Sequence, residues 1–256
     1  MELLHYSEMG DGDPLIILHG LFGSSKNWQS LAKVFSRYFK VFTLDLRNHG
    51  QSFHDDEVNY PAMVGDVKRL LNHLGIDACS VIGHSMGGKT AILLALENPQ
   101  LISKLIVADI APVVYSHTHS HLIEPILALS LDKMSNRAEV DKALLPEIPD
   151  TMLRNFLLQN LERKSDHWRW KVNWSAIGQH MDNLTGFPIL SRGWKLGTPT
   201  LFIRGEQSEY IGVAEKLEIE DHFETFTLQT IGNAGHWLHA EQPEQFSQLA
   251  VNFLLE

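Results

Sequence analysis

One short segment of the sequence combines a nucleophile with the backbone that a nucleophile needs: Gly83-His84-Ser85-Met86-Gly87. It follows a strand candidate and precedes a helical pattern, and Gly-x-Ser-x-Gly in that setting predicts a sharp turn that exposes the serine hydroxyl. The turn is so tight that side chains at Gly83 and Gly87 would clash, and we expect Ser85 to be strained. The following helix favours negative charge at its N-terminus. We therefore predict Ser85 as a catalytic nucleophile.

A second glycine-rich turn is suited to stabilising that charge. The segment His19-Gly20-Leu21-Phe22-Gly23 follows the strand candidate Leu15–Leu18. A His-Gly turn at a strand end can direct a backbone N–H at the same site. The N–H groups of Leu21 and Met86 would then form an oxyanion hole with two donors.

A serine hydroxyl is a weak nucleophile until a histidine accepts its proton. His236 lies late in the chain, between the strand candidate Phe226–Ile231 and the last helix, where enzymes with such a serine turn carry this base. His239 is the nearby competitor, which we expect to be solvated or structural. We expect His84 to be a packing neighbour of the nucleophile rather than a base.

The histidine in turn needs a carboxylate that fixes its tautomer and stabilises its charged form. The commonest position, about three residues beyond Gly205, holds Ser208, a neutral hydroxyl, with Glu206 and Glu209 near it. Asp109 instead ends the strand candidate that follows the nucleophile's helix, which would place it at the sheet edge beside the serine. We favour Asp109 as the acid, with Glu206 and Glu209 as the alternatives.

Two other polar groups are assigned no chemistry. Asp45 and Arg47 follow a strand candidate, and we expect them to pair and pin the loop beneath the site. His117, His119 and His121 alternate, which would suit a metal site only in an extended segment. They have no accompanying cysteine or close carboxylate, so a solvated face is favoured over a metal site.

Short apolar runs alternate with helical patterns, as in a mostly parallel sheet with helices on both faces. The strand candidates are Leu15–Leu18, Val41–Leu44, Cys79–Ile82, Leu105–Ala108, Thr200–Ile203 and Phe226–Ile231. One helix candidate ends at Gly75 and the last begins near Pro243. Residues 113–197 break the alternation with helical patterns, no clear strand, and Trp168, Trp170, Trp174 and Trp194. We predict a helical cap at 113–197, inserted into a core made of 1–112 and 198–256.

These segments together resemble the α/β-hydrolase superfamily over nearly the whole chain. More narrowly, Leu46-Arg47-Asn48-His49-Gly50-Gln51-Ser52, Asp109-Ile110-Ala111-Pro112-Val113 and Arg204-Gly205-x-x-Ser208-x-Tyr210-Ile211 are similar to the YbfF-type bacterial esterases and the abhydrolase-domain-11 proteins. In that group the acid comes from the position that matches Asp109, and a serine occupies the usual acid position. The resemblance implies an α/β-hydrolase fold with a cap. It also implies that Tyr210 and Trp237 approach the substrate pocket from the core and Tyr115 from the cap, with Ser208 beside them.

The composition of the chain limits the partners, the cofactors and the cellular compartment that we expect for this chemistry. The chain has 256 residues, 21 Lys and Arg against 31 Asp and Glu, and a net charge of −10, which argues against nucleic-acid partners. Cys79 is the single cysteine, so no internal disulfide is possible. No apolar run reaches the length of a membrane span, and the start of the chain is unlike a signal peptide, so we expect a cytoplasmic protein. The sequence has no P-loop or dinucleotide motif, and we expect no cofactor and no catalytic metal.

The predicted function is a serine hydrolase that cleaves small carboxylic esters, or acyl-CoA thioesters, through an acyl-enzyme on Ser85. Three alternatives remain from the sequence. A thioesterase would use the same residues. A carbon–carbon bond hydrolase or lyase would offer cap arginines to an acidic substrate, and the candidates are Arg154, Arg163, Arg169 and Arg192. A ligand-binding receptor would release product stoichiometrically rather than catalytically.

Overall fold

The structure is a computed structural model that describes residues 2–116, 119–165, 167–188 and 195–256. Three residues singled out in the sequence, His117, Arg192 and Trp194, lie outside the described residues. Within those ranges, no helix is long and apolar enough to cross a lipid bilayer.

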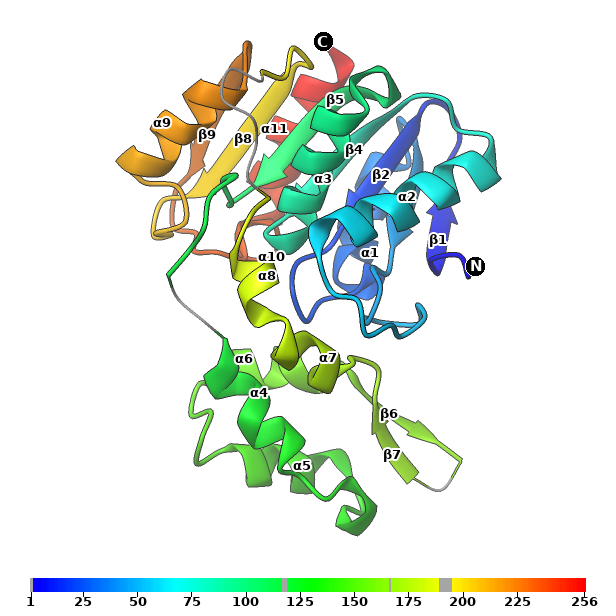
Figure 1. Ribbon diagram of the computed structural model, residues 1–256, viewed down its shortest axis with the longest axis vertical. Coiled ribbons are helices and arrows are strands. Elements are labelled where there is room, and N and C mark those ends of the chain that lie inside the picture. Colours follow the sequence, from blue (N-terminus) through cyan, green and yellow to red (C-terminus); the bar gives the residue numbers. More distant parts are fainter. Residues whose placement is uncertain (1, 117–118, 166, 189–194) are drawn as a thin grey trace.

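A seven-stranded sheet in the order β1-β3-β2-β4-β5-β8-β9 forms the centre of the molecule (Figure 1). Its strands are β1 (Tyr6–Met9), β2 (Pro14–Leu18), β3 (Lys40–Leu44), β4 (Cys79–His84), β5 (Ile102–Ala108), β8 (Thr200–Gly205) and β9 (Phe226–Ile231). Neighbouring strands are parallel except for β1, which runs antiparallel to β3 at one edge. The predicted α/β class with a mostly parallel sheet is confirmed, and each predicted strand is present.

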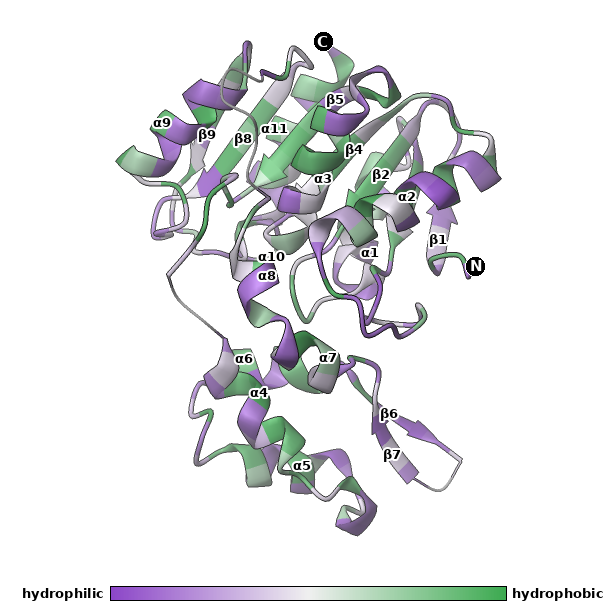
Figure 2. Cartoon of the chain, viewed as in Figure 1, coloured by the Kyte–Doolittle hydropathy of each residue, from purple (hydrophilic) through white to green (hydrophobic). Residues whose placement is uncertain are grey.

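Helices cover both faces of this sheet (Figure 1). One layer holds α1 (Gln29–Phe35), α10 (Leu238–Glu241) and α11 (Pro243–Leu255), and the other holds α2 (Tyr60–Leu74), α3 (Met86–Glu97) and α9 (Val213–His222). Side chains of β2 alternate between the layers: Ile16 packs with α2 and α3, whereas Ile17 packs with α1 and α11. Figure 2 shows the result, with hydrophobic colour along the central strands and hydrophilic colour on the outward helix surfaces. The nearly continuous apolar runs of the strands follow from this two-sided burial.

Local signals fix where the helices begin and end. Asn59 precedes α2, and its side chain accepts a hydrogen bond from the Ala62 backbone N–H at 2.8 Å. Gly75 ends α2 with φ 66°, a left-handed conformation in which glycine has no side chain to clash. Pro243 starts α11, where its missing N–H costs nothing. Both predicted helix boundaries are confirmed. Three short 3₁₀ turns span Ser25–Trp28, Pro99–Leu101 and Leu131–Lys133.

The segment between β5 and β8 lies beyond one edge of the sheet (Figure 1). It contains α4 (Ser120–Leu127), α5 (Arg137–Leu144), α6 (Thr151–Leu158), β6 (Leu161–Lys164), β7 (His167–Trp170), α7 (Trp174–Gln179) and α8 (Met181–Thr185). The expectation of no strand here is wrong, because β6 and β7 form an antiparallel hairpin. The polar residues that make these strands read as a loop are exposed, and Trp168 and Trp170 alternate with them in the half-buried positions. We call 113–197 the cap; its boundaries as a separate domain stay a prediction.

The sheet brings the predicted chemistry to one edge. In a parallel sheet the carboxyl ends of the strands lie together, and ligands bind outside them. Ser85 directly follows β4, Asp109 directly follows β5, and Gly205 ends β8. In Figure 1 this edge faces the cap.

Candidate active site

The serine turn has the backbone that the sequence predicts. Ser85 lies between β4 and α3 with φ 52° and ψ −119°, an unusual conformation for a residue with a side chain. A Cβ atom on Gly83 would lie 2.4 Å from the Gly87 carbonyl oxygen, and one on Gly87 would lie 2.4 Å from the Leu18 carbonyl oxygen. The Ser85 N–H donates to the carbonyl of Ala108 at 3.1 Å. Glycine is therefore required at both flanking positions, and β2, β4 and β5 together hold the turn.

Ser85, His236 and Asp109 form a continuous chain of hydrogen bonds. The Ser85 hydroxyl lies 3.0 Å from His236 Nε2, and His236 Nδ1 lies 2.8 Å from Asp109 Oδ2. A carboxylate can only accept, so Nδ1 carries the proton and Nε2 is free to accept from the serine. Asp109 is fully buried, whereas His236 keeps 20% of its side chain exposed. The three residues come together from three separate turns.

The carboxylate of Asp109 is held on both oxygens. Oδ1 accepts the Gly205 backbone N–H at 3.0 Å. Oδ2, which faces His236, also accepts the hydroxyl of Ser208. The alternative acids lie elsewhere: Glu206 accepts the backbone N–H of Asn233 at 3.0 Å, and Glu209 is exposed. The structure therefore brings Asp109, and neither glutamate, to His236.

Two other histidines lie near His236, but both are buried and neither is exposed as a catalytic base would be. His84 donates from Nε2 to the His236 carbonyl at 2.8 Å, and burial holds the pKa of His84 well below its ordinary value. His239 stacks on Trp28 with ring centroids 4.4 Å apart. Burial lowers the pKa of His239 to about 3. His84 is the expected packing neighbour, and His239 is structural rather than solvated.

The glycine-rich turn after β2 packs directly against the serine. A Cβ on Gly20 would lie 3.2 Å from Ser85 Cβ. His19 is buried and fixes this turn, because its Nδ1 donates to the Gly20 carbonyl at 2.8 Å and its Nε2 accepts the Leu46 N–H at 3.0 Å. Leu21 lines the same cavity as Ser85, and Met86 is the first residue of α3. Both predicted oxyanion donors thus lie beside the serine.

The loop after β3 is pinned differently from the prediction. Arg47 pairs with Asp66 of α2 rather than with Asp45, at 2.6 Å between Nε and Oδ2. Asp45 instead accepts the backbone N–H groups of Ser25 and Gln51 at 2.7 and 2.8 Å. Asp45 and Arg47 are close in the sequence, but their side chains bind different neighbours. The expected Asp45–Arg47 pair is wrong, and the structural role of the loop remains.

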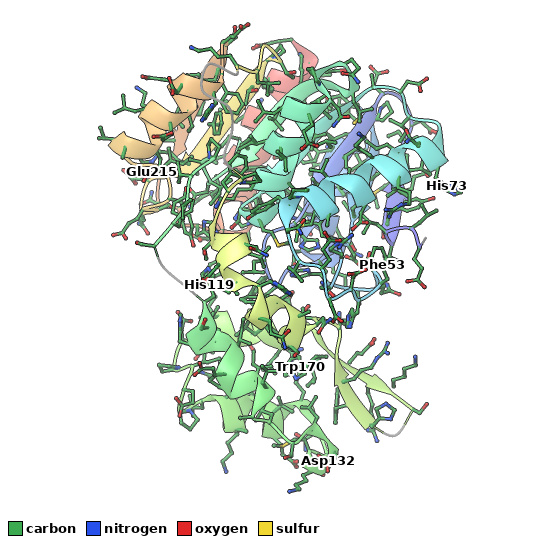
Figure 3. All side chains as sticks on the ribbon, viewed as in Figure 1. Phe53, His73, His119, Asp132, Trp170 and Glu215 are labelled. Atoms are coloured by element: carbon green, nitrogen blue, oxygen red, sulfur yellow. The ribbon has the colours of Figure 1, made fainter. Side chains whose placement is uncertain are left out.

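Two cavities open on the serine. The larger measures about 320 Å³ and is lined by Leu21, Phe22, His84, Ser85, His119, His121, Leu122, Leu153, Phe156, Tyr210, His236 and Trp237. The smaller measures about 30 Å³ and is lined by Leu21, Tyr60, Ser85, Met86, Lys89, Ile110, Tyr115, His119, Leu184, Thr185 and Tyr210. Figure 3 places His119 where the cap meets the core. The site is therefore a mainly apolar space between the sheet edge and the cap.

The four predicted pocket residues take different places. Tyr210 stacks on the His236 ring, with centroids 4.0 Å apart, and lines both cavities. Trp237 lines the larger cavity and Tyr115 the smaller. The Tyr115 hydroxyl donates to the Tyr210 carbonyl at 2.6 Å, which ties the cap to the loop after β8. Ser208 lies behind Asp109 and lines neither cavity.

Sequence reasoning missed Lys89, one of the residues that fasten the cap to the core. The Lys89 ammonium donates to the carbonyls of Val113, Thr185 and Gly186 at 2.8, 2.9 and 2.6 Å. Burial lowers the pKa of Lys89 to about 7. The signal was available, because a lysine inside the apolar helix after Ser85 needs buried partners. Among the described residues, no group of three or more His, Cys, Asp or Glu side chains is placed to hold a metal ion.

Comparison with known proteins gives consistent matches. The model of the alpha/beta hydrolase fold family matches residues 13–243. A sn-1-specific diacylglycerol lipase from Xenopus tropicalis is 37% identical and covers 97% of this chain and 80% of its own. The esterase YbfF of Escherichia coli is 31% identical over 91% of this chain and 90% of its own. A solved structure titled marine microorganism esterase superposes with a TM-score of 0.95 at 39% identity, covering 98% of this chain and 99% of its own.

Proposed function

The chain belongs to the α/β-hydrolase family, and we propose that it hydrolyses small-molecule carboxylic esters through an acyl-enzyme on Ser85. The observation that carries the proposal is the Ser85–His236–Asp109 chain of hydrogen bonds, at 3.0 and 2.8 Å, on the wall of an apolar cavity. The similarity to a lipase and to two esterases supports an ester as substrate.

In the first half-reaction, Ser85 Oγ attacks the ester carbonyl carbon while His236 Nε2 accepts the hydroxyl proton. The carbonyl oxygen becomes an oxyanion, which accepts hydrogen bonds from the N–H groups of Leu21 and Met86. When the tetrahedral intermediate collapses, the C–O bond breaks and the alcohol leaves with the proton from His236. The acyl group remains on Ser85.

In the second half-reaction, water attacks the acyl carbon and gives its proton to His236. Collapse of this second intermediate releases the carboxylic acid and returns the proton to Ser85. The imidazole is positively charged at both intermediates. Asp109 stabilises that charge across the 2.8 Å contact, and the stacked ring of Tyr210 offers its electron-rich face to the same cation.

The alternative functions make different demands on the site. A thioester would use the same residues, so acyl-CoA substrates belong in the same assay. A carbon–carbon bond hydrolase acting on an acidic substrate would need a cap arginine at the cavity. Arg154 is instead paired with Asp141 at 2.8 Å, and Arg169 is paired with Glu162. Of the cap arginines that the structure describes, neither these two nor Arg163 lines either cavity, so none of the three supports an acidic substrate.

The test is a panel of short- and long-chain nitrophenyl esters and acyl-CoAs, assayed with wild type and Ser85→Ala. We expect many turnovers per protein molecule on at least one class of ester, and a loss of more than about 10⁴-fold in Ser85→Ala. A single turnover per molecule would instead indicate a receptor. Full activity in Ser85→Ala would exclude the proposed mechanism.

A further inference from the structure

The two cavities beside Ser85 differ about tenfold in size and differ in what lines them. The cavity of about 320 Å³ includes His236 and Trp237, with Phe156 of the cap. The cavity of about 30 Å³ includes Met86 and Lys89 of α3. The two share Ser85, so an ester whose carbonyl carbon lies at Ser85 places its alcohol and acyl substituents in different cavities. The carbonyl oxygen lies at the side of the smaller cavity, which Leu21 and Met86 line.

The chemistry of the leaving group decides which substituent goes where. The alcohol oxygen must lie within hydrogen-bond reach of His236 Nε2, because that atom returns the proton. His236 lines the larger cavity and is absent from the lining of the smaller one. The alcohol portion therefore occupies the larger cavity, and the acyl substituent is left with the smaller.

The smaller cavity has little room and firm walls. A volume of about 30 Å³ holds two or three water-sized groups, since about 10–15 Å³ by this measure holds one water. Tyr60 is 1% exposed, and its hydroxyl donates to the Leu184 carbonyl at 2.6 Å. Lys89 is held by three carbonyl oxygens. Expansion of this cavity would require breaking these buried contacts.

We propose that this protein selects esters with an acetyl-sized acyl group and a bulky apolar or aromatic alcohol. The inference rests on the proposed function and adds the substrate class. The larger cavity suits the alcohol because Leu122, Phe156 and Trp237 supply apolar surface around it. A longer acyl chain would meet Leu184 and Ile110, which are 6% and 3% exposed.

The experiment compares two isomers of one molecular formula: benzyl acetate, with its ring on the alcohol side, and methyl phenylacetate, with its ring on the acyl side. The kcat/KM of each is divided by its rate constant for alkaline hydrolysis, which removes the difference in intrinsic reactivity. We expect benzyl acetate to be preferred by at least tenfold. Equal rates, or a preference for methyl phenylacetate, would overturn the subsite assignment.

Two variants test the origin of the preference. Leu184→Ala, with Ile110→Val as the milder second change, enlarges the smaller cavity and should shift the ratio toward methyl phenylacetate by at least threefold. Leu153→Ala enlarges the larger cavity and should not shift the ratio in that direction. An unchanged ratio in folded Leu184→Ala and Ile110→Val would also overturn the assignment. If wild type hydrolyses neither isomer nor any ester of the panel, the proposed function itself fails together with this inference.

Discussion

The turns that carry Ser85, His236 and Asp109 and the cap beside them are held by different interactions. Around Ser85, the backbone is packed so closely that a Cβ atom on Gly83 or Gly87 would lie 2.4 Å from a carbonyl oxygen. The Ser85 N–H is also bonded to the Ala108 carbonyl. The cap is instead fastened mainly by side chains from both sides. From the core, Lys89 donates to three cap carbonyls and Tyr60 donates to one. From the cap, Tyr115 donates to the Tyr210 carbonyl. Atoms that react need positions fixed within a fraction of an ångström. A cap, in contrast, selects a ligand by the volume that it leaves for it.

This difference separates two kinds of mutational effect. Changes at the sheet edge should remove the chemistry while leaving the fold intact, or should break the turn itself. Changes at the cap anchors should leave the reacting atoms aligned and alter access, substrate choice and local opening. Each substitution below changes either a residue of the sheet edge or a residue that anchors the cap.

The largest effect is expected at the base. His236→Ala should lose on the order of 10⁶ in kcat, nearly as much as Ser85→Ala, because the members of a triad act as a unit. In wild type, kcat/KM should rise as the solution is made less acidic, since only neutral His236 accepts the serine proton. Burial lowers the pKa of His239 to about 3 and holds that of His84 well below its usual value, so neither contributes this rise. A kcat/KM that does not fall in acid while the fold is kept would argue against His236 as the base.

Loss of the acid's charge should come next. Asp109→Asn should lower kcat by about 10⁴, because an amide favours the wrong tautomer of the histidine. The thermal midpoint should change little, and circular dichroism would show whether the fold is kept. Glu206→Gln is the matched control and should cost less than about tenfold. Ser208→Ala, which removes one hydrogen bond to Asp109, should be similarly mild. Retained activity in Asp109→Asn with collapse in a glutamate variant would move the acid to the loop after β8.

The serine turn should tolerate no side chain at Gly87. Gly87→Ala would place a Cβ 2.4 Å from the Leu18 carbonyl oxygen, and we expect it to lower the free energy of unfolding by about 3 kcal/mol. Gly65→Ala is the control, because a Cβ there meets nothing within 4 Å. That helical site should gain up to about 1 kcal/mol. Urea titration of both variants measures the contrast, and equal stabilities would show that the turn is less tightly packed than described.

The smallest effect is expected at the cap anchor. Lys89→Met leaves three partly buried cap carbonyls without their donor, which should raise the open population of the cap about tenfold, or about 1.4 kcal/mol. Limited proteolysis should then cut faster within 113–197, while Lys33→Met, an exposed change on α1, should behave as wild type. Unaltered cleavage in Lys89→Met would show that other contacts fasten the cap.

The core and the reacting residues were the predictable part, for a physical reason. Strands that are buried on both faces consist of continuous apolar runs, and the serine turn requires glycines at a fixed spacing. Both features can therefore be recognised in short stretches of the sequence. The hairpin β6–β7 left a weak signal, because it is exposed and its tryptophans alternate with charged residues. The Arg47–Asp66 pair could not be predicted, since α2 brings Asp66 to the loop only in the folded chain. The cavity sizes depend on how cap and core meet, which no local pattern records.

Covalent labelling shows whether Ser85 carries the acyl group. A phosphonate or sulfonyl fluoride is incubated with wild type, Ser85→Ala and Asp109→Asn, and adducts are counted by intact mass and located by peptide mapping. We expect one adduct per wild-type chain, located at Ser85, none in Ser85→Ala, and slow labelling in Asp109→Asn. A wild-type adduct on another residue, or undiminished labelling of Ser85→Ala, would contradict this role of Ser85.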